Sequence, residues 1–139
     1  MAALTRNTLI RLANVKRSDA RLLLQNGRWS TAYYVYGLAV ELAIKASIAK
    51  QIKAQIIPDR NFSRVFFSHE LPALIALAGL TKSLESKLGD SEFKGAWEVV
   101  RSWNVESRYE HVDEVRAKAM ADAVEGRKAG IYRWLKTHW

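Results

Sequence analysis

The sequence contains no cysteine and only two prolines among its 139 residues. The lack of cysteine excludes disulfide bonds and thiolate metal sites, and is compatible with a reducing cytoplasm. Common nucleotide and metal motifs are also missing, because there is no GxxxxGK[ST] loop, no GxGxxG turn and no HExxH helix. The three histidines, His69, His111 and His138, are far apart and lack carboxylates at metal-ligand spacing. We therefore expect no metal ion and no other cofactor.

The chain also lacks an uncharged apolar segment long enough to span a bilayer. Its longest apolar stretch, residues 29–49, carries Glu41 and Lys45 near the middle. Charged and polar side chains interrupt the N-terminus too early for the apolar core of a signal peptide. We expect a cytoplasmic protein with no membrane association.

Apolar residues recur three and four positions apart along most of the chain, and no long alternating run indicates a strand. This period predicts an all-α fold. A length of 139 residues with 49% hydrophobic content is typical of one compact domain, so we expect a single domain over residues 1–139.

The first half of the chain predicts two long helices. The first covers about Thr5 to Asn26 and ends at Gly27, since glycine tolerates the left-handed backbone that follows many helices. The second begins after a cap at Ser30 or Thr31 and is apolar on nearly every face, which places it at the centre of the bundle. A glycine inside it, Gly37, indicates close approach of a neighbouring element.

The second half of the chain predicts shorter helices. Residues 52–68 form the longest irregular connection, because the helical period is lost there. Ser68, Ser91 and Asp113 are the expected N-caps of the helices that follow. The expected helices are residues 69–78, 82–88, about 91–104 and 114–125, with a break at Gly126 and Gly130 before the C-terminal segment.

Glu41 and Lys45 are the two charged residues of the central helix. They lie four positions apart in the favourable order for an ion pair on one helix face. A buried position requires such pairing, because an isolated charge in the core is costly. We expect a structural ion pair at the edge of the core, and we also consider both residues as ligand-binding candidates.

The formal net charge of +8 is unevenly distributed along the chain. Residues 81–114 carry eight acidic and five basic side chains, whereas residues 115–139 carry two acidic and six basic ones. In the first helix, Arg6, Arg17 and Arg21 fall within roughly 60° of one another on a helical projection. This basic stripe is a candidate phosphate-binding surface, although a charged solvent face is common in soluble helices.

A polar cluster, residues 101–114, separates two expected helices and contains Glu106, Arg108, Tyr109 and His111. In a functional interpretation, Arg108 binds phosphate and Tyr109 stacks on a base. In a structural interpretation, Arg108 pairs with a glutamate, namely Glu106, Glu110 or Glu41, and Tyr109 packs on the central helix. The structural interpretation is favoured, because the local acidic side chains repel phosphate.

Three segments together resemble the HEPN (higher eukaryotes and prokaryotes nucleotide-binding) domain family. They are "GRWSTAYYVYGLAVELAIKASI" at residues 27–48, "SHELPALIALAGL" at residues 68–80 and "WNVESRYE" at residues 103–110. The resemblance implies a bundle of about five helices that forms a homodimer and binds RNA or nucleotides. It also implies a prokaryotic toxin–antitoxin, defence or stress system, with an antitoxin or a nucleotidyltransferase as a partner. We expect dimer contacts through the helices that carry Trp103 and Tyr109.

Catalytic HEPN proteins resemble metal-independent endoribonucleases in which an arginine, four to six intervening residues and a histidine meet at a dimer cleft. The histidine moves protons and the arginine stabilises phosphate charge. In this chain only two residues separate Arg108 from His111, so the motif is not intact at its expected place. Arg64 and His69 have the right spacing but precede the expected third helix.

The sequence therefore leaves enzymatic activity open. The catalytic candidates are Arg108 with His111, or the alternative pair Arg64 with His69. The primary expectation is an RNA-binding or nucleotide-binding module, and the alternatives are an endoribonuclease toxin or a non-catalytic partner of a nucleotidyltransferase. The ligand-binding candidates are Glu41, Lys45, Trp103, Glu106 and Tyr109.

Overall fold

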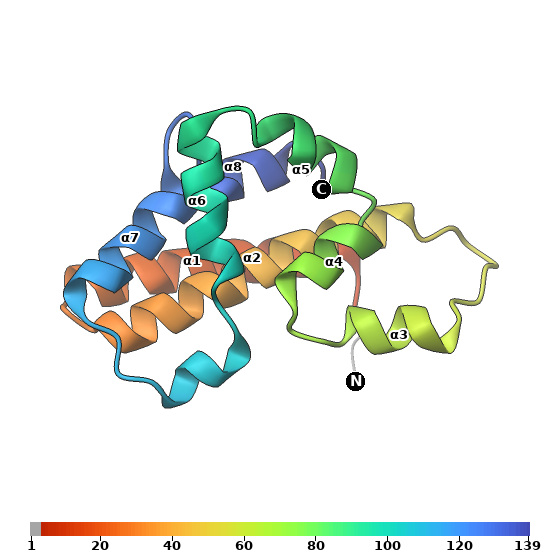
Figure 1. Cartoon of the computed structure of the whole chain (residues 1–139). Helices are drawn as coiled ribbons and strands as arrows, with labels where there is room; N and C mark the ends of the chain where they lie inside the picture. Colours follow the sequence, from red (N-terminus) through yellow and green to blue (C-terminus); the bar gives the residue numbers. More distant parts are fainter. Residues whose placement is uncertain (1–3) are drawn as a thin grey trace.

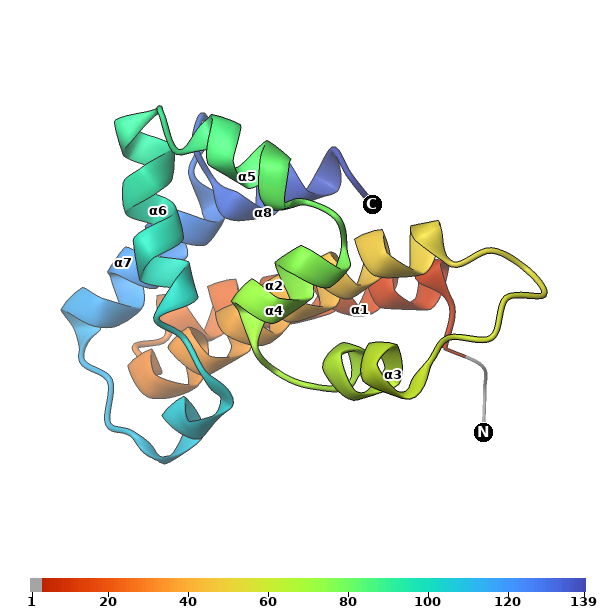
Figure 2. The same ribbon diagram turned by 45° about the vertical axis from the view of Figure 1, so that its right-hand side comes forward.

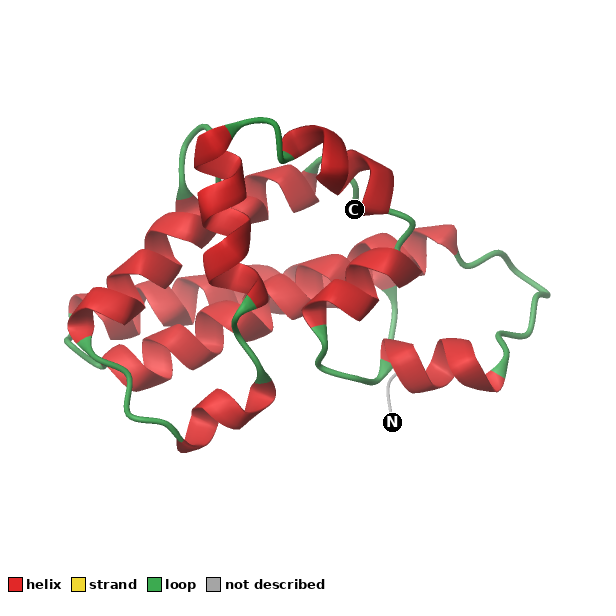
Figure 3. Ribbon diagram, in the orientation of Figure 1, coloured by secondary structure: helices red, strands yellow, loops and turns green. Residues whose placement is uncertain are grey.

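The computed structural model describes residues 4–139, and this part of the chain is all-helical with no β-strand (Figures 1 and 3). The all-α fold class expected from the hydrophobic period is confirmed. Residues 1–3 of the expected single domain lie outside the described range. The described elements are α1 (Arg6–Gln25), α2 (Trp29–Gln51), α3 (Arg60–Phe66), α4 (Leu71–Leu77), α5 (Thr81–Lys87), α6 (Ser91–Arg101), the 3-10 helix η1 (Val105–Tyr109), α7 (Glu114–Glu125) and α8 (Ile131–Lys136).

The two longest helices, α1 and α2, pack side by side as a hairpin (Figure 1). Thr5 caps α1, because its Oγ1 accepts a hydrogen bond from the Thr8 backbone nitrogen at 3.1 Å. Gly27 has a φ of 70°, the left-handed conformation that favours glycine, so the chain reverses within a short turn. The expected bounds of the first helix are confirmed to within one residue at each end.

The second helix of this hairpin, α2, lies at the centre of the molecule and packs against α1, α4, α7, α8 and η1 (Figure 2). Thirteen of its 23 residues are buried, including Tyr33 and Tyr36. This burial on several sides agrees with a sequence that is apolar on nearly every face. The expected central position of α2 is confirmed.

Gly37 of α2 is in direct contact with the indole of Trp103, which follows α6. A Cβ atom placed on Gly37 would overlap Trp103 Cε2, so only glycine fits there without movement of the indole. Trp103 is 3% exposed, and its indole also stacks on Tyr34 with ring centroids 6.0 Å apart. The close approach expected at Gly37 is therefore made by an aromatic ring, which anchors the start of η1 to α2.

A second group of helices covers one side of the hairpin. α7 packs against both α2 and α6, and α8 packs against α2, α6 and α7 (Figure 2). The turn between α7 and α8 requires glycine, because a Cβ atom on Gly130 would overlap the Gly126 carbonyl oxygen. This turn directs α8 back along the core, and the expected helix break at the two glycines is confirmed.

All three serine caps expected from the sequence are wrong. α2 begins at Trp29, one residue before Ser30, and the Ser30 hydroxyl instead accepts a hydrogen bond from the Val112 backbone nitrogen at 2.8 Å. Ser68 lies before α4 and donates its hydroxyl proton to the Val65 carbonyl oxygen at 2.7 Å. The Ser30 contact joins segments that are distant in sequence, which the local sequence does not reveal, whereas the Ser68 contact is local, with its acceptor three residues earlier.

Aspartates provide the side-chain caps of three other helices. Asp113 accepts from the Arg116 nitrogen at 2.8 Å, as expected for α7. Asp90, not Ser91, caps α6 and accepts from the Glu92 nitrogen at 2.9 Å. Asp59 caps α3, a helix within the connection that the sequence predicted to be irregular. Its seven residues are too few for a clear apolar period.

No helix in residues 4–139 is both long and apolar enough to cross a bilayer. The candidate stretch, residues 29–49, lies within α2, where Glu41 and Lys45 are 5% and 7% exposed. They are enclosed by other parts of the same chain, as the sequence indicated.

Replacing Gly37 with alanine should strongly destabilise the fold, because the new methyl group overlaps the buried Trp103 indole. Overpacking of this kind costs roughly 1–3 kcal/mol, sometimes more. Gly95→Ala in α6 is the matched control, since a Cβ atom there meets nothing within 4 Å. We expect Gly95→Ala to stabilise the fold by roughly 0.5–1 kcal/mol through helix propensity. Thermal and urea unfolding measure both changes, and equal stability of the two variants would contradict the Gly37–Trp103 contact.

Candidate functional site

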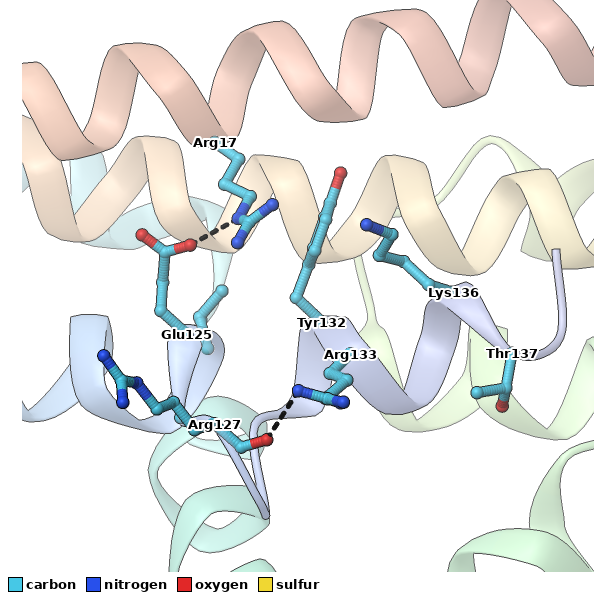
Figure 4. A pocket seen from close by; sticks show the side chains of 9 residues that line it. Arg17, Glu125, Arg127, Tyr132, Arg133, Lys136 and Thr137 are labelled. Atoms are coloured by element: carbon cyan, nitrogen blue, oxygen red, sulfur yellow. Dashed lines mark hydrogen bonds and ion pairs between the residues drawn. The ribbon is translucent and has the colours of Figure 1, made fainter.

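A pocket of about 490 Å³ opens between α1, the end of α7 and α8 (Figure 4). Four of its lining side chains are basic and one is acidic. The turn at Gly126 and Gly130 allows α8 to fold back, so that side chains before and after the turn share the pocket (Figure 4). We refer to it as the basic pocket, and its charged lining residues are Arg17, Glu125, Arg127, Arg133 and Lys136.

The only acidic side chain of the basic pocket, Glu125, is bonded within the chain. Its Oε1 pairs with Arg17 Nε and with Arg21 Nη2, the latter at 2.8 Å. Its Oε2 accepts from Arg21 Nε at 3.0 Å and from the Tyr36 hydroxyl, also at 3.0 Å. Both carboxylate oxygens are therefore satisfied, and Glu125 has little remaining capacity to repel an incoming anion.

These contacts determine the protonation of the groups in the network. Burial of the Glu125 carboxyl opposes ionisation, but hydrogen bonds from Arg21, Arg17 and Tyr36 outweigh burial and lower its pKa below the ordinary 4.5. Burial and the neighbouring Glu125 charge raise the pKa of Tyr36. Glu125 is therefore an anion at neutral pH, and Tyr36 remains a hydrogen-bond donor.

Tyr132 forms the buried wall of the basic pocket. Burial raises its pKa to about 12, and its hydroxyl donates to Asn14 Oδ1 at 2.6 Å. The guanidinium carbon of Arg17 lies 4.7 Å from the Tyr132 ring centroid. Arg17 is thus held between the Glu125 carboxylate and an aromatic face, with its side chain 30% exposed.

Three further cations of the basic pocket have no carboxylate partner among the described residues: Arg127, Arg133 and Lys136. All three are exposed. Arg133 Nη1 donates to the Arg127 carbonyl oxygen at 2.9 Å, which holds its guanidinium beside the pocket (Figure 4). A pocket with three unpaired cations and a neutralised carboxylate favours an anionic ligand.

The predicted basic stripe on α1 does not form one free surface. Arg17 and Arg21 bond to Glu125, and only Arg17 lines the basic pocket. Arg6 lies near the start of the helix, where its Nε is buried and has no hydrogen-bond partner among the described residues. Sequence reasoning missed Arg127, Arg133 and Lys136, and the only available signal was the basic excess of residues 115–139.

A second group of predicted site residues meets near the middle of the central helix. Glu41 Oε2 pairs with Lys45 Nζ at 3.2 Å, which confirms the expected ion pair. Glu41 Oε1 also lies 2.7 Å from His69 Nδ1, a contact that the sequence did not predict. Lys45 Nζ lies 5.4 Å from the Phe66 ring centroid. The buried carboxylate therefore connects α2 to the segment between α3 and α4.

His69 lines a groove of about 720 Å³, which brings it together with Trp103 and Glu106. We call this the His69 groove, and its lining residues are Ser68–Ala73 and Trp103–Glu106. Lys45 does not line it, and Glu41 reaches it only through His69. Three predicted site residues from distant parts of the sequence thus share one groove.

The remaining catalytic candidates do not reach either cavity. Arg108, Tyr109 and His111 are exposed and line neither the basic pocket nor the His69 groove. The guanidinium carbon of Arg108 lies 4.9 Å from the Tyr109 ring centroid. Arg64 is exposed and donates to Asn61 Oδ1 at 2.7 Å, outside the groove that contains His69. Neither predicted Arg–His pair lines a common cavity.

The structural interpretation of the polar cluster is wrong in its details. Tyr109 is 75% exposed and does not pack on the central helix. Arg108 forms no ion pair with a carboxylate in residues 4–139, whereas Glu110 pairs with Arg116 at 2.8 Å. The short 3-10 helix turns the Arg108 side chain outward, while α7 places Arg116 beside Glu110. Trp103, expected in a dimer contact, is buried within its own chain and has little free surface for a partner.

Comparisons with protein-family models, with curated proteins and with solved structures find no match to this chain. The resemblance to HEPN domains therefore rests on the three sequence segments alone.

Glu125→Gln should lower the unfolding free energy at neutral pH by roughly 1–3 kcal/mol, because Arg17 and Arg21 lose their ionic partner. The lowered folded-state pKa of Glu125 means that its contribution is complete above the ordinary value of 4.5 and is lost as the pH falls through the folded-state value. Urea unfolding from neutral pH to about pH 3 measures this, and the curves of wild type and variant should converge in acid.

Glu114→Gln is the matched control, since it removes an exposed carboxylate that is paired with Lys118 at 2.6 Å. An exposed pair contributes roughly 0–1 kcal/mol, so this variant should resemble the wild type. A Glu125→Gln effect that is the same at every pH would show that ionisation of Glu125 does not stabilise the fold.

Proposed function

We propose that this chain is an HEPN-type helical module that binds RNA or nucleotides through phosphate groups held in the basic pocket. The observation that carries the proposal is the charge of the pocket, where Arg127, Arg133 and Lys136 have no carboxylate partner among the described residues and Glu125 is neutralised. Phosphate oxygens accept hydrogen bonds from several donors at once, which arginine provides in a planar fork.

The size of the basic pocket is consistent with this ligand class. Its volume of about 490 Å³ lies within the range of about 300–1,000 Å³ that is typical of small-molecule sites. The exposed cations also allow continued contact with a polymer backbone outside the pocket. Both a free nucleotide and a single-stranded RNA therefore fit the proposal through the same phosphate chemistry.

The cellular setting is proposed from the sequence resemblance. A small HEPN-type module that binds RNA or nucleotides fits a prokaryotic toxin–antitoxin, defence or stress system in the cytoplasm. An antitoxin or a nucleotidyltransferase is the partner that such a setting implies.

Cleavage of RNA is supported less well than binding. The one favourable feature is His69, which is oriented by Glu41 at 2.7 Å and is accessible from a groove. However, Glu70 and Glu106 line the same groove and no arginine does. A phosphate there would meet carboxylates without a cation to stabilise the transition state. We therefore propose binding as the primary function.

Charge reversal at Lys136 should weaken binding of a fluorescein-labelled single-stranded RNA and of ATP by about tenfold or more, because a pocket cation becomes an anion. Arg133→Glu should also weaken binding of both ligands. Fluorescence anisotropy measures RNA affinity and calorimetry measures ATP affinity, each at several salt concentrations. The slope of the logarithm of RNA affinity against the logarithm of salt concentration should also become shallower by about 0.7 per lost phosphate contact.

Lys94→Glu is the matched control, because Lys94 is exposed on α6 and lies outside the pocket. The substitution changes the net charge by the same amount as Lys136→Glu. We expect it to reduce affinity by less than about threefold through general electrostatics. Equal losses of affinity for Lys94→Glu and Lys136→Glu, or no measurable binding by the wild type, would contradict the proposal. Intact RNA after long incubation with the wild type in EDTA would separate binding from cleavage.

A further inference from the structure

The connection from the end of α2 to α3 and beyond exposes apolar side chains to an unusual degree. Ile56, Ile57 and Phe67 are 61%, 92% and 68% exposed. Isolated exposed apolar residues are ordinary, but a group within one short segment indicates an interaction surface. Figures 1 and 2 show the loop between α2 and α3 projecting from the body of the molecule, while α3 folds back beside α4. We call residues 50–67 the projecting segment.

The projecting segment is also basic. Its only acidic residue, Asp59, accepts a hydrogen bond from the Phe62 nitrogen at 2.7 Å and so caps α3. The basic residues of the segment are Lys50, Lys53, Arg60 and Arg64, and none of them pairs with a carboxylate among the described residues. The segment therefore presents apolar and positively charged groups together.

Part of the projecting segment is held in a defined conformation before any partner binds. The rings of Phe62 and Phe66 stack with centroids 6.2 Å apart, and Phe66 also contacts Phe67 edge to face at 5.1 Å. The Asp59 cap fixes the start of α3. A surface that is already ordered loses less conformational entropy when it docks.

The His69 groove has the complementary composition. Pro72, Ala73 and Val105 contribute accessible apolar surface to its lining, and Glu70 and Glu106 contribute exposed carboxylates. Neither carboxylate forms an ion pair within residues 4–139. In a chain with a net charge of +8, this groove is a local acidic and apolar surface.

The projecting segment does not occupy the groove of its own chain. Ile57 and Phe67 remain exposed, and no residue of the segment lines the groove. The two surfaces are nevertheless adjacent, since the segment ends at Phe67 and the groove begins at Ser68. A two-fold axis beside this junction would let each of two copies place its segment in the groove of the other. Such an exchange forms two identical contacts, each between one segment and one groove, and gives a closed dimer with no free segment or groove.

We propose that the projecting segment and the His69 groove form a reciprocal interface between two copies of this chain. Apolar side chains such as Ile57 enter the groove, and the basic side chains of the segment face Glu70 and Glu106 across its rim. This interface differs from the dimer contact expected at Trp103 and Tyr109, because it uses the projecting segment and the accessible rim of the groove, whereas Trp103 is buried. It does not depend on phosphate binding in the basic pocket.

Sedimentation equilibrium of the wild-type chain at high micromolar concentration tests the interface, with two single variants beside it. Ile57→Glu places a negative charge on the segment, and Glu106→Lys places a positive charge on the groove. Each should increase the dimer dissociation constant by about tenfold or more, because each contact then joins like charges or loses apolar burial. Both residues are exposed, so the melting temperature at low protein concentration should stay unchanged.

The decisive step is to mix the two variants. In one contact of the mixed pair, the glutamate introduced in the segment of one chain faces the lysine introduced in the groove of the other. The second contact keeps its wild-type residues on both sides. A heterodimer should therefore form even though each variant alone is monomeric. Val115→Glu is the matched control, since Val115 is 77% exposed and lies outside both surfaces, and it should leave dimerisation unchanged.

Three results would overturn the proposal. A wild type that sediments as a monomer would exclude a second copy as the occupant and would leave the groove to a different protein of similar apolar and basic character. Variants that stay dimeric would place the dimer contact elsewhere. A mixture that stays monomeric would show that the segment and the groove do not meet.

Discussion

Burial of the central helix α2 on several sides is the constraint on which the rest of the structure depends. Its inner faces are buried, so a charged or polar group there is costly without a partner from the same chain. Glu41 meets this need through Lys45 and His69, and Tyr36 through Glu125. The contacts with His69 and Glu125 cross from α2 to elements that are distant in sequence, and they fix the positions of those elements.

The contacts of α2 with Glu125 and His69 also position these two side chains at the candidate surfaces. The bond from Tyr36 helps to hold Glu125, which neutralises two arginines beside the basic pocket and leaves the later cations of the chain free for an anion. Near the middle of α2, Glu41 orients His69 at the edge of an acidic and apolar groove. Pairing with Glu125 thus leaves a basic surface, whereas the acidic charge of the groove comes from the exposed residues Glu70 and Glu106. The first fits phosphate and the second fits a basic partner.

Local sequence signals predicted the fold well and the sites only in part. The bounds of α1, the cap at Asp113 and the Glu41–Lys45 pair follow from residues within a few positions of one another, which is the range that helical periodicity and capping describe. Glu125 meets arginines more than 100 positions away, and no pattern in the sequence indicates that contact. The cap expected at Ser30 failed for the same reason, since its hydroxyl bonds a distant backbone group.

The central claim concerns Glu125, which bonds Tyr36 of α2 and pairs with Arg17 and Arg21. This pairing leaves the other cations of the basic pocket available for phosphate. Nuclear magnetic resonance of the labelled chain during titration with inorganic phosphate and ATP tests it most directly. The account predicts that signals of Arg17 and of residues 125–137 shift with a common dissociation constant, while those of residues 68–73 and 103–106 do not. Shifts confined to the His69 groove, or spread evenly over all exposed lysines and arginines, would contradict it.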